Sequence, residues 1–178
     1  MKSYIHQFDH SLTDVIRRLP RSWDPFFISV THLGDPITVC LIAVAFGVWA
    51  MTGRGVRMVL AAAAIPSTLI VGYGLKLLFE RARPVLDLGY NLRLDSFSFP
   101  SGHSSGAMIT YGLLAYLAWL SLPAPWNIPV AVVLVIIPIV VGVSRVYLGV
   151  HYPSDVLAGW LLGLVMLAVV IFIVRPLS

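Results

Sequence analysis

The fold is decided by residues 96–144, which read SFSFPSGHSSGAMITYGLLAYLAWLSLPAPWNIPVAVVLVIIPIVVGVS. This stretch contains no Asp, Glu, Lys or Arg, and it is about twice as long as the ~20 apolar residues that carry a helix across a bilayer. Pro123 and Pro125 interrupt it between Ser121 and Asn127, where the chain can turn. The stretch therefore predicts two transmembrane helices, over residues 103–121 and 127–144.

Three other stretches also lack charged residues, at 36–53, 58–75 and 156–174. Each is long enough for one membrane crossing, and helices are the structures that satisfy backbone polar groups in lipid at this length. We therefore expect an all-α integral membrane protein, a bundle of five transmembrane helices. The three additional spans are predicted at residues 36–52, 57–79 and 155–174.

The composition agrees with this class. Of the 178 residues, 58% are hydrophobic and 11% are charged, and the mean hydropathy is +0.89. A soluble domain carries about 25% charged residues, and a disordered chain is poor in apolar residues, so both classes are excluded. The single cysteine, Cys40, excludes a disulfide framework and a cysteine-based metal site, which leaves only His or carboxylate metal sites open.

Residues 1–35 form a distinct N-terminal segment. Its apolar residues recur every three to four positions, between charged ones, which predicts an amphipathic helix ending near Pro20. Trp23, Phe26 and Phe27 follow, and aromatic residues favour the membrane interface. The helix either lies along the membrane surface or packs on the bundle, and both can hold. We divide the chain into this interfacial segment at 1–35 and a single transmembrane domain at 36–178.

Five spans place the two ends of the chain on opposite sides of the membrane. Arg54, Arg57 and Arg175 then share one side, which the positive-inside rule assigns to the cytoplasm. The loops at 80–102 and 145–154 lie on the other side. The N-terminal segment also lies there, and its arginines run against the same rule.

Polar and ionisable residues gather at the span ends on that second side. Ionisable residues at membrane depth are costly, so a cluster of them indicates a functional site. Cationic side chains and the free amides at a helix start are ligands that suit a phosphoryl group. The candidate phosphate ligands are Lys76, Arg83, Ser101 as a helix N-cap, Gly102 and Arg145.

Two histidines and an aspartate complete a site able to react. His151 and Asp155 are four residues apart, and a carboxylate bonded to one imidazole nitrogen leaves the other free to attack. His103 is distant in sequence but lies at the same membrane level, where it can protonate a leaving oxygen. These residues predict phosphoryl transfer in two steps through a phosphohistidine. No metal is required, because Lys and Arg can stabilise the transferred group.

These residues resemble the signature of the type 2 phosphatidic acid phosphatase superfamily. Its three motifs are Lys, six residues and Arg-Pro; Pro-Ser-Gly-His; and Ser-Arg, five residues, His, three residues and Asp. All are intact and in order here, as Lys76 to Arg83-Pro84, Pro100-Ser101-Gly102-His103, and Ser144-Arg145 to His151 to Asp155.

The resemblance implies that His151 is the nucleophile, Asp155 its partner and His103 the acid and later the base. It implies the same phosphate ligands, no cofactor or metal, and a site on the extracytoplasmic face of a bacterial cytoplasmic membrane. Many members have six spans, so six is the alternative count. Arg81, Glu80 and Arg93 match no motif and are expected to contact solvent or headgroups. No role is assigned to Asp87 or Asp95, and His6, His10 and His32 are expected at the interface rather than as ligands.

The predicted function is a membrane lipid phosphatase. Its substrate would be a phosphate monoester or diphosphate of a lipid, such as phosphatidic acid, phosphatidylglycerol phosphate, undecaprenyl diphosphate or a lipid A phosphate. A phosphotransferase of the same superfamily is one alternative, and a non-catalytic lipid-binding or transport protein is another. The expected partners are the lipid substrate and the bilayer, with no nucleic acid, and the oligomeric state is open.

Overall fold

The computed structural model describes residues 2–84 and 96–175, with side chains from Tyr4 onward. All the regular secondary structure of these residues is helical. The α-helices are α1 (Lys2–Arg17), α2 (Asp24–Thr31), α3 (Pro36–Met51), α4 (Val56–Phe79), α5 (Gly102–Ser121), α6 (Asn127–Tyr147) and α7 (Pro153–Val174), and short 3-10 turns precede α2 (η1, Arg21–Trp23) and α3 (η2, His32–Gly34).

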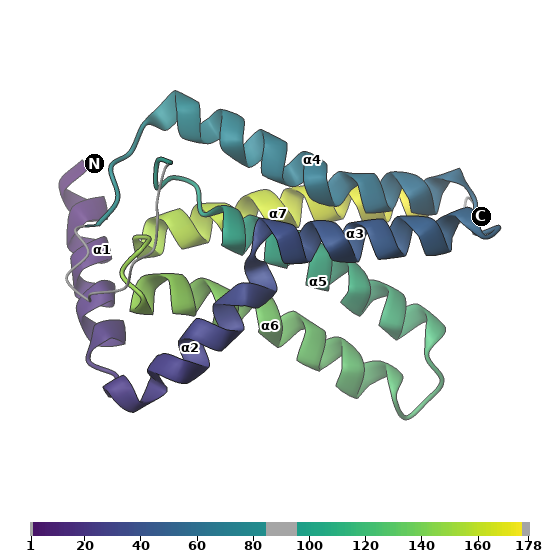
Figure 1. Cartoon of the computed structure of the whole chain (residues 1–178), viewed down its shortest axis with the longest axis horizontal. Coiled ribbons are helices and arrows are strands. Elements are labelled where there is room, and N and C mark those ends of the chain that lie inside the picture. Colours follow the sequence, from purple (N-terminus) through teal and green to yellow (C-terminus); the bar gives the residue numbers. More distant parts are fainter. Residues whose placement is uncertain (1, 85–95, 176–178) are drawn as a thin grey trace.

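Helices α3 to α7 run along the long axis of the molecule, and α1 lies across one end (Figure 1). Each predicted span is a helix, with bounds within three residues of those expected from the charge-free stretches. The marked N- and C-terminal ends lie at opposite ends of the long axis. This arrangement has the form of a transmembrane bundle.

Among the described helices, α4, α6 and α7 are long and apolar enough to cross a membrane. The bent pair of Arg21–Gly34 and Pro36–Met51, which turns by 46°, makes a fourth crossing if it is one span. Helix α5 is less apolar because it is the inner helix of the bundle, with nine buried residues that include Ser104, Ser105 and Thr110. The count of five or six crossings therefore stays a prediction.

The α5–α7 crossing brings two helix starts together. A Cβ atom on Gly159 would lie 2.5 Å from the backbone oxygen of Ser101, and one on Gly163 would lie 2.6 Å from Met108 Cβ. Only glycine permits this approach, as is common where membrane helices pack closely. The Ser101 amide donates to the Asp155 carbonyl at 3.0 Å, so the first turns of α5 and α7 are joined directly.

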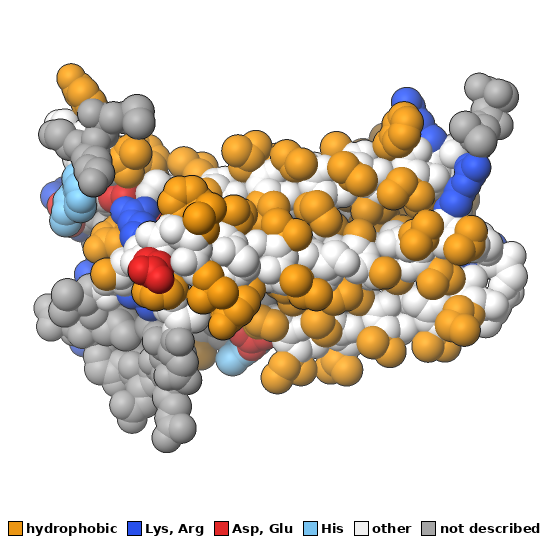
Figure 2. All heavy atoms as spheres, turned by 90° about the horizontal axis from the view of Figure 1, so that it is seen from above, with side chains coloured by type: hydrophobic (Ala, Val, Ile, Leu, Met, Phe, Trp, Pro, Cys, Tyr) orange, Lys and Arg blue, Asp and Glu red, His pale blue; other side chains and the backbone are white. Residues whose placement is uncertain are grey.

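The outer surface is mostly apolar along the bundle. In the view of Figure 2, hydrophobic side chains cover the flank, and most Lys, Arg and acidic side chains lie towards the two ends. Inside, the largest apolar cluster joins α3, α4, α5 and α7 through residues such as Val39, Ile65, Ile109 and Val170. The apolar flank and the polar ends match the pattern expected of a protein surrounded by lipid.

The N-terminal segment packs on the bundle. Helix α1 contacts α6 and α7, and Phe27 of α2 lies against Tyr147 with 4.3 Å between ring centroids. The apolar side chains of Ile5, Phe8 and Val15 remain exposed on α1. Packing on the bundle is therefore confirmed, and location along the membrane surface stays a prediction that these exposed side chains favour.

Candidate active site

The last turn of α4 and the chain after it carry the first two candidate ligands, Lys76 and Arg83. Glu80 takes a left-handed conformation (φ 44°) that ends α4, and the backbone then runs beside residues 96–98. The Ser98 amide donates to the Arg81 carbonyl at 2.8 Å. Lys76 Nζ donates to the Phe97 carbonyl, and Arg83 Nε donates to the Ser96 carbonyl at 2.8 Å. Both cations are thus held at the same end of the bundle.

Helix α5 begins at the site, as the Pro-Ser-Gly-His pattern predicts. Ser101 is the N-cap, and its Oγ accepts from the Ser104 amide at 3.4 Å and the Ser104 hydroxyl at 2.9 Å. The amides of Gly102 and His103 are the first of the helix, where no preceding helical carbonyl can accept from them. A Cβ atom on Gly102 would meet nothing within 4 Å, so open space lies beside this helix start. Such a start suits an anion.

The spacing between Arg145 and His151 is explained by how α6 ends. Gly149 is left-handed (φ +69°), its amide donates to the Val146 carbonyl at 3.0 Å, and the Val150 amide donates to the Arg145 carbonyl at 3.1 Å. This is the Schellman termination, which needs a residue tolerant of positive φ. The chain reverses there and returns His151 to the level of Arg145.

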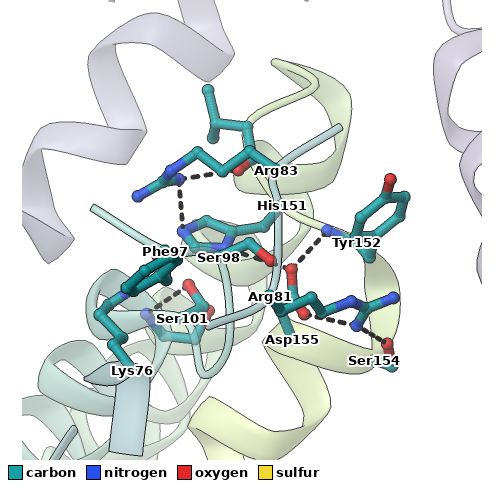
Figure 3. A network of polar contacts seen from close by, with 12 residues as sticks. Lys76, Arg81, Arg83, Phe97, Ser98, Ser101, His151, Tyr152, Ser154 and Asp155 are labelled. Atoms are coloured by element: carbon teal, nitrogen blue, oxygen red, sulfur yellow. Dashed lines mark hydrogen bonds and ion pairs between the residues drawn. The ribbon is translucent and has the colours of Figure 1, made fainter. Parts of the chain in front are cut away.

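The tautomer of His151 follows from its neighbours. Arg83 Nη1 lies 3.3 Å from His151 Nε2 (Figure 3), and a guanidinium can only donate, so Nε2 is the unprotonated nitrogen. The proton then sits on Nδ1, which lies 3.5 Å from Asp155 Oδ2. This separation is long for a hydrogen bond, as it often is before substrate binds.

Burial keeps the His151 ring neutral. The side chain is 2% exposed, and burial lowers its pKa to about 3 against the opposing effect of Asp155. Burial also lowers the pKa of Arg83 from its ordinary value, although a guanidinium remains charged at neutral pH. The site therefore holds a neutral imidazole beside a fixed positive charge.

Both oxygens of the Asp155 carboxylate accept hydrogen bonds. Its Oδ2 accepts from the Tyr152 amide at 2.9 Å, and its Oδ1 accepts from Arg81 Nη1 at 2.6 Å (Figure 3). The carboxylate is completely buried. Its orientation toward His151 is thus set by the first turn of α7 and by Arg81.

Arg145 is a buried cation with spare donor capacity. It is 5% exposed, its Nη1 donates to Thr31 Oγ1 at 2.7 Å, and its buried Nε has no hydrogen-bond partner in the part of the chain that the structure describes. The positive charges of Arg83 and Arg145 repel the positive charge of Lys76. Three cations that repel one another in a buried site favour an anion between them.

His103 has a carboxylate partner outside the three motifs. Its Nε2 lies 2.6 Å from Asp35 Oδ1, at the residue just before α3. The side chain of His103 is 18% exposed. The second histidine is thus also paired with an aspartate.

Comparison with known proteins decides the family. The model of the PAP2 superfamily matches residues 55–177, which is more than half of the chain. The chain belongs to the PAP2 superfamily. Its relatives include phosphatidylglycerophosphatase B of Bacillus subtilis, 31% identical over 169 residues that cover 91% of this chain and 81% of the relative. The putative undecaprenyl-diphosphatase YbjG of Escherichia coli is 35% identical over 161 residues, covering 87% and 77%.

Solved structures agree with this PAP2 assignment. The crystal structure of the transmembrane PAP2 type phosphatidylglycerolphosphate phosphatase from Bacillus subtilis matches with a TM-score of 0.84 and 28% identity, over 98% of this chain and 90% of that one. Aquifex aeolicus LpxE shares the fold, with a TM-score of 0.69 and 23% identity over 91% and 93%. The PAP2 protein described here is thus a phosphatase and a multi-pass membrane protein, related to lipid phosphatases.

Four residues without a predicted role in the site join the polar network of this PAP2 protein. Arg81, expected to contact solvent or headgroups, instead bonds to Asp155 and to Asp9. Asp35 and Thr31 contact His103 and Arg145. Of these four, only Asp35 has a local sequence signal: it precedes Pro36, a pattern typical of a helix start.

The remaining expectations have mixed outcomes. Glu80 is exposed as expected, His6 and His10 stack on each other on α1, and His32 bonds to Asp35. Arg93, Asp87 and Asp95 lie outside the described residues.

Proposed function

We propose that the protein hydrolyses a phosphate monoester or diphosphate of a membrane lipid through a phosphohistidine formed at His151. The observation that carries this proposal is the contact between His151 Nε2 and Arg83 Nη1 at 3.3 Å. It leaves an unprotonated, buried nitrogen directly beside a cation that can hold the phosphoryl group.

The phosphate would bind between Lys76, Arg83 and Arg145. It would also contact the free amide of Gly102 at the start of α5 and Ser101, the N-cap of that helix. Arg145 offers a buried Nε without a partner among the described residues. Cations and oriented amides stabilise the charge that spreads over the equatorial oxygens in the transition state. These groups can do without a metal, and we propose a metal-independent reaction.

The reaction would take place in two steps. In the first, His151 Nε2 attacks phosphorus, an N–P bond forms, the P–O bond to the lipid breaks, and His103 gives its proton to the leaving oxygen. In the second, His103 takes a proton from water, the oxygen attacks phosphorus, and the N–P bond breaks to release phosphate. Asp155 stabilises the imidazole that carries charge in both steps.

The site lies at one end of the bundle, so a lipid phosphate could reach it from the membrane–water boundary while its tail stays in the bilayer. We propose the extracytoplasmic face of a bacterial cytoplasmic membrane for this end. The opposite end holds Arg57, which donates to the Arg175 carbonyl at 3.0 Å, and would face the cytoplasm. Phosphatidylglycerol phosphate and undecaprenyl diphosphate are the leading substrates, since two relatives are named phosphatidylglycerophosphatase B and putative undecaprenyl-diphosphatase.

Phosphate release by the purified protein in detergent, with EDTA present, tests this proposal. The panel is phosphatidic acid, phosphatidylglycerol phosphate, undecaprenyl diphosphate and a lipid A phosphate, each with wild type and His151→Ala. We expect release that EDTA leaves unchanged and that His151→Ala abolishes. Acid-labile, base-stable labelling from a ³²P-labelled lipid would identify the phosphohistidine. Equal inactivity of both proteins on the whole panel would contradict the hydrolase.

The same assay separates the alternatives. A phosphotransferase would label an added acceptor lipid with ³²P and release little inorganic phosphate. A lipid-binding or transport protein would bind the lipids and give neither product. The pairing of His151 and His103 with carboxylates favours catalysis over binding, because binding alone needs no oriented imidazole.

A further inference from the structure

A second polar cluster contacts Asp155 at Oδ1, the carboxylate oxygen that does not face His151. Its other members have no role in the proposed mechanism. Arg81 is at its centre: Nη1 donates to Asp155 Oδ1 at 2.6 Å and to Ser154 Oγ at 2.7 Å, and Nη2 donates to Asp9 Oδ2 at 2.7 Å. Figure 3 shows Arg81 between Asp155 and Ser154. One guanidinium thus joins a residue of α1 to a residue of the candidate active site.

The two carboxylates of this cluster are buried, the Arg81 side chain is 24% exposed, and all three have partners within the cluster. The Asp9 and Asp155 side chains are 1% and 0% exposed, and the Arg81 guanidinium lies over the Tyr152 ring, 4.3 Å from its centroid. Burial would lower the pKa of Arg81, but the hydrogen bond to Asp9 and the charge of Asp155 raise it above its ordinary value. Breaking such a buried pair leaves an uncompensated charge, so each member depends on the others.

Asp9 also holds the first turn of α7. Its Oδ1 accepts from the Ser154 amide at 2.9 Å, and its Oδ2 accepts from the Ser154 hydroxyl at 2.8 Å. Helix α7 begins at Pro153, so Ser154 has a free amide that α7 itself cannot satisfy. A carboxylate from α1 therefore caps the helix that carries Asp155.

The contact between Arg81 and Asp155 helps to orient the carboxylate that faces His151. Arg81 holds Oδ1 of Asp155 and the Tyr152 amide holds Oδ2, which fixes the plane of the carboxylate 3.5 Å from His151 Nδ1. Without Arg81, the carboxylate could rotate away from that nitrogen. The position of the imidazole that attacks phosphorus would then be less defined.

From this we infer that Asp9 and Arg81 are positioning residues for the reaction, which aim Asp155 at His151 and make α1 part of the active site. The inference rests on the proposed function, because it assigns Asp155 the role of orienting the nucleophile. It gives the N-terminal helix a positioning role in the reaction besides its packing on the bundle.

Four single variants and one double variant of the full chain test this. They are Arg81→Met, Arg81→Lys, Asp9→Asn, Asp14→Asn and the double Asp9→Asn with Arg81→Met. Asp14 is an exposed residue of the same helix and serves as the matched control. Each purified protein is assayed in detergent for kcat and KM on the best lipid substrate, and for the rate of ³²P phosphoenzyme formation.

We expect Arg81→Met to lower kcat and the phosphoenzyme rate on the order of 10- to 100-fold, as misplacement of a reacting group does. KM should stay within about twofold of wild type, because neither residue contacts the phosphate. Arg81→Lys should recover part of kcat. Asp9→Asn should cost roughly 3- to 10-fold and should add little to Arg81→Met, because residues that act as a unit are not additive. Asp14→Asn should equal wild type.

Two results would overturn the inference while the wild type stays active. One is an unchanged kcat in Arg81→Met and Asp9→Asn. The other is a loss in these variants that raises KM alone or follows only the amount of folded protein, measured by thermal unfolding in the same detergent. Failure of the proposed function is a different result, since wild type would then release no phosphate and form no phosphoenzyme.

Discussion

Asp35 lies between two imidazole rings: its Oδ1 is 2.6 Å from His103 Nε2, and its Oδ2 is 2.6 Å from His32 Nδ1. A carboxylate only accepts, so both facing nitrogens carry protons. The two rings differ in exposure, because the His32 side chain is 66% exposed and that of His103 is 18% exposed. The contact with His103 is therefore the one that can orient a ring for proton transfer.

Replacing Asp35 by Asn tests this pairing. The amide keeps the shape but removes the charge that stabilises a protonated His103, so we expect kcat to fall on the order of 10- to 100-fold, within the usual contribution of acid–base catalysis. His32→Gln is the matched control, because it removes the other partner of Asp35, and kcat should stay within about twofold. Steady-state phosphate release measures both. Equal losses in the two variants would assign Asp35 a structural role instead.

The buried state of His151 predicts how stability depends on pH. Its folded pKa of about 3 is below the ordinary 6.5, so the unfolded chain takes up a proton that the folded chain does not. Wild type should therefore lose stability relative to His151→Gln as pH falls from about 6.5 towards 3. At pH 5 the difference should be on the order of 1–2 kcal/mol.

Thermal unfolding of both proteins in one detergent, from pH 7.5 to pH 5, measures this difference. Titrating groups that do not contact residue 151 cancel between them, because the two chains differ only at that position. A difference in stability that does not change with pH would mean that His151 is not buried as a neutral ring.

Gly102 marks the space that we assign to the phosphoryl group. A Cβ atom there would meet nothing of the protein within 4 Å, so Gly102→Ala should fold with unchanged stability. If substrate occupies that space, kcat/KM should fall about 10-fold or more, as a misplaced substrate loses its alignment. Gly74→Ala is the control, since its Cβ would also meet nothing within 4 Å but lies on α4. Full activity of Gly102→Ala would place the phosphate elsewhere.

The close crossing of α5 and α7 should be sensitive to a single methyl group. In Gly159→Ala the new Cβ would lie 2.5 Å from the Ser101 carbonyl oxygen, so the helices must separate, at a cost of about 1–3 kcal/mol. Activity should fall as well, because Ser101 and Asp155 are joined across this contact. Gly72→Ala, whose Cβ would lie 3.6 Å from Leu162 Cδ2, should keep stability and activity. Thermal unfolding and phosphate release on the same samples compare the two variants.

The sequence by itself determined the helices and the motif residues. Charge-free stretches predicted the helical segments, since lipid leaves the backbone few alternatives to a helix. The spacing of Lys76, Arg83, Arg145 and His151 was readable because each lies at a span end, where short local turns set its position. Ser101 was recognisable as a cap for the same local reason.

Only the tertiary structure decided which residues support the site from a distance. Asp9 reaches Arg81 and Ser154, and Asp35 reaches His103, across separations of about 70 residues or more. No periodicity or spacing encodes such contacts, because they depend on how α1 and the start of α3 pack against the bundle. From the sequence, Arg81 is expected to contact solvent or headgroups. The fold places it between two buried carboxylates, whose negative charges its guanidinium compensates.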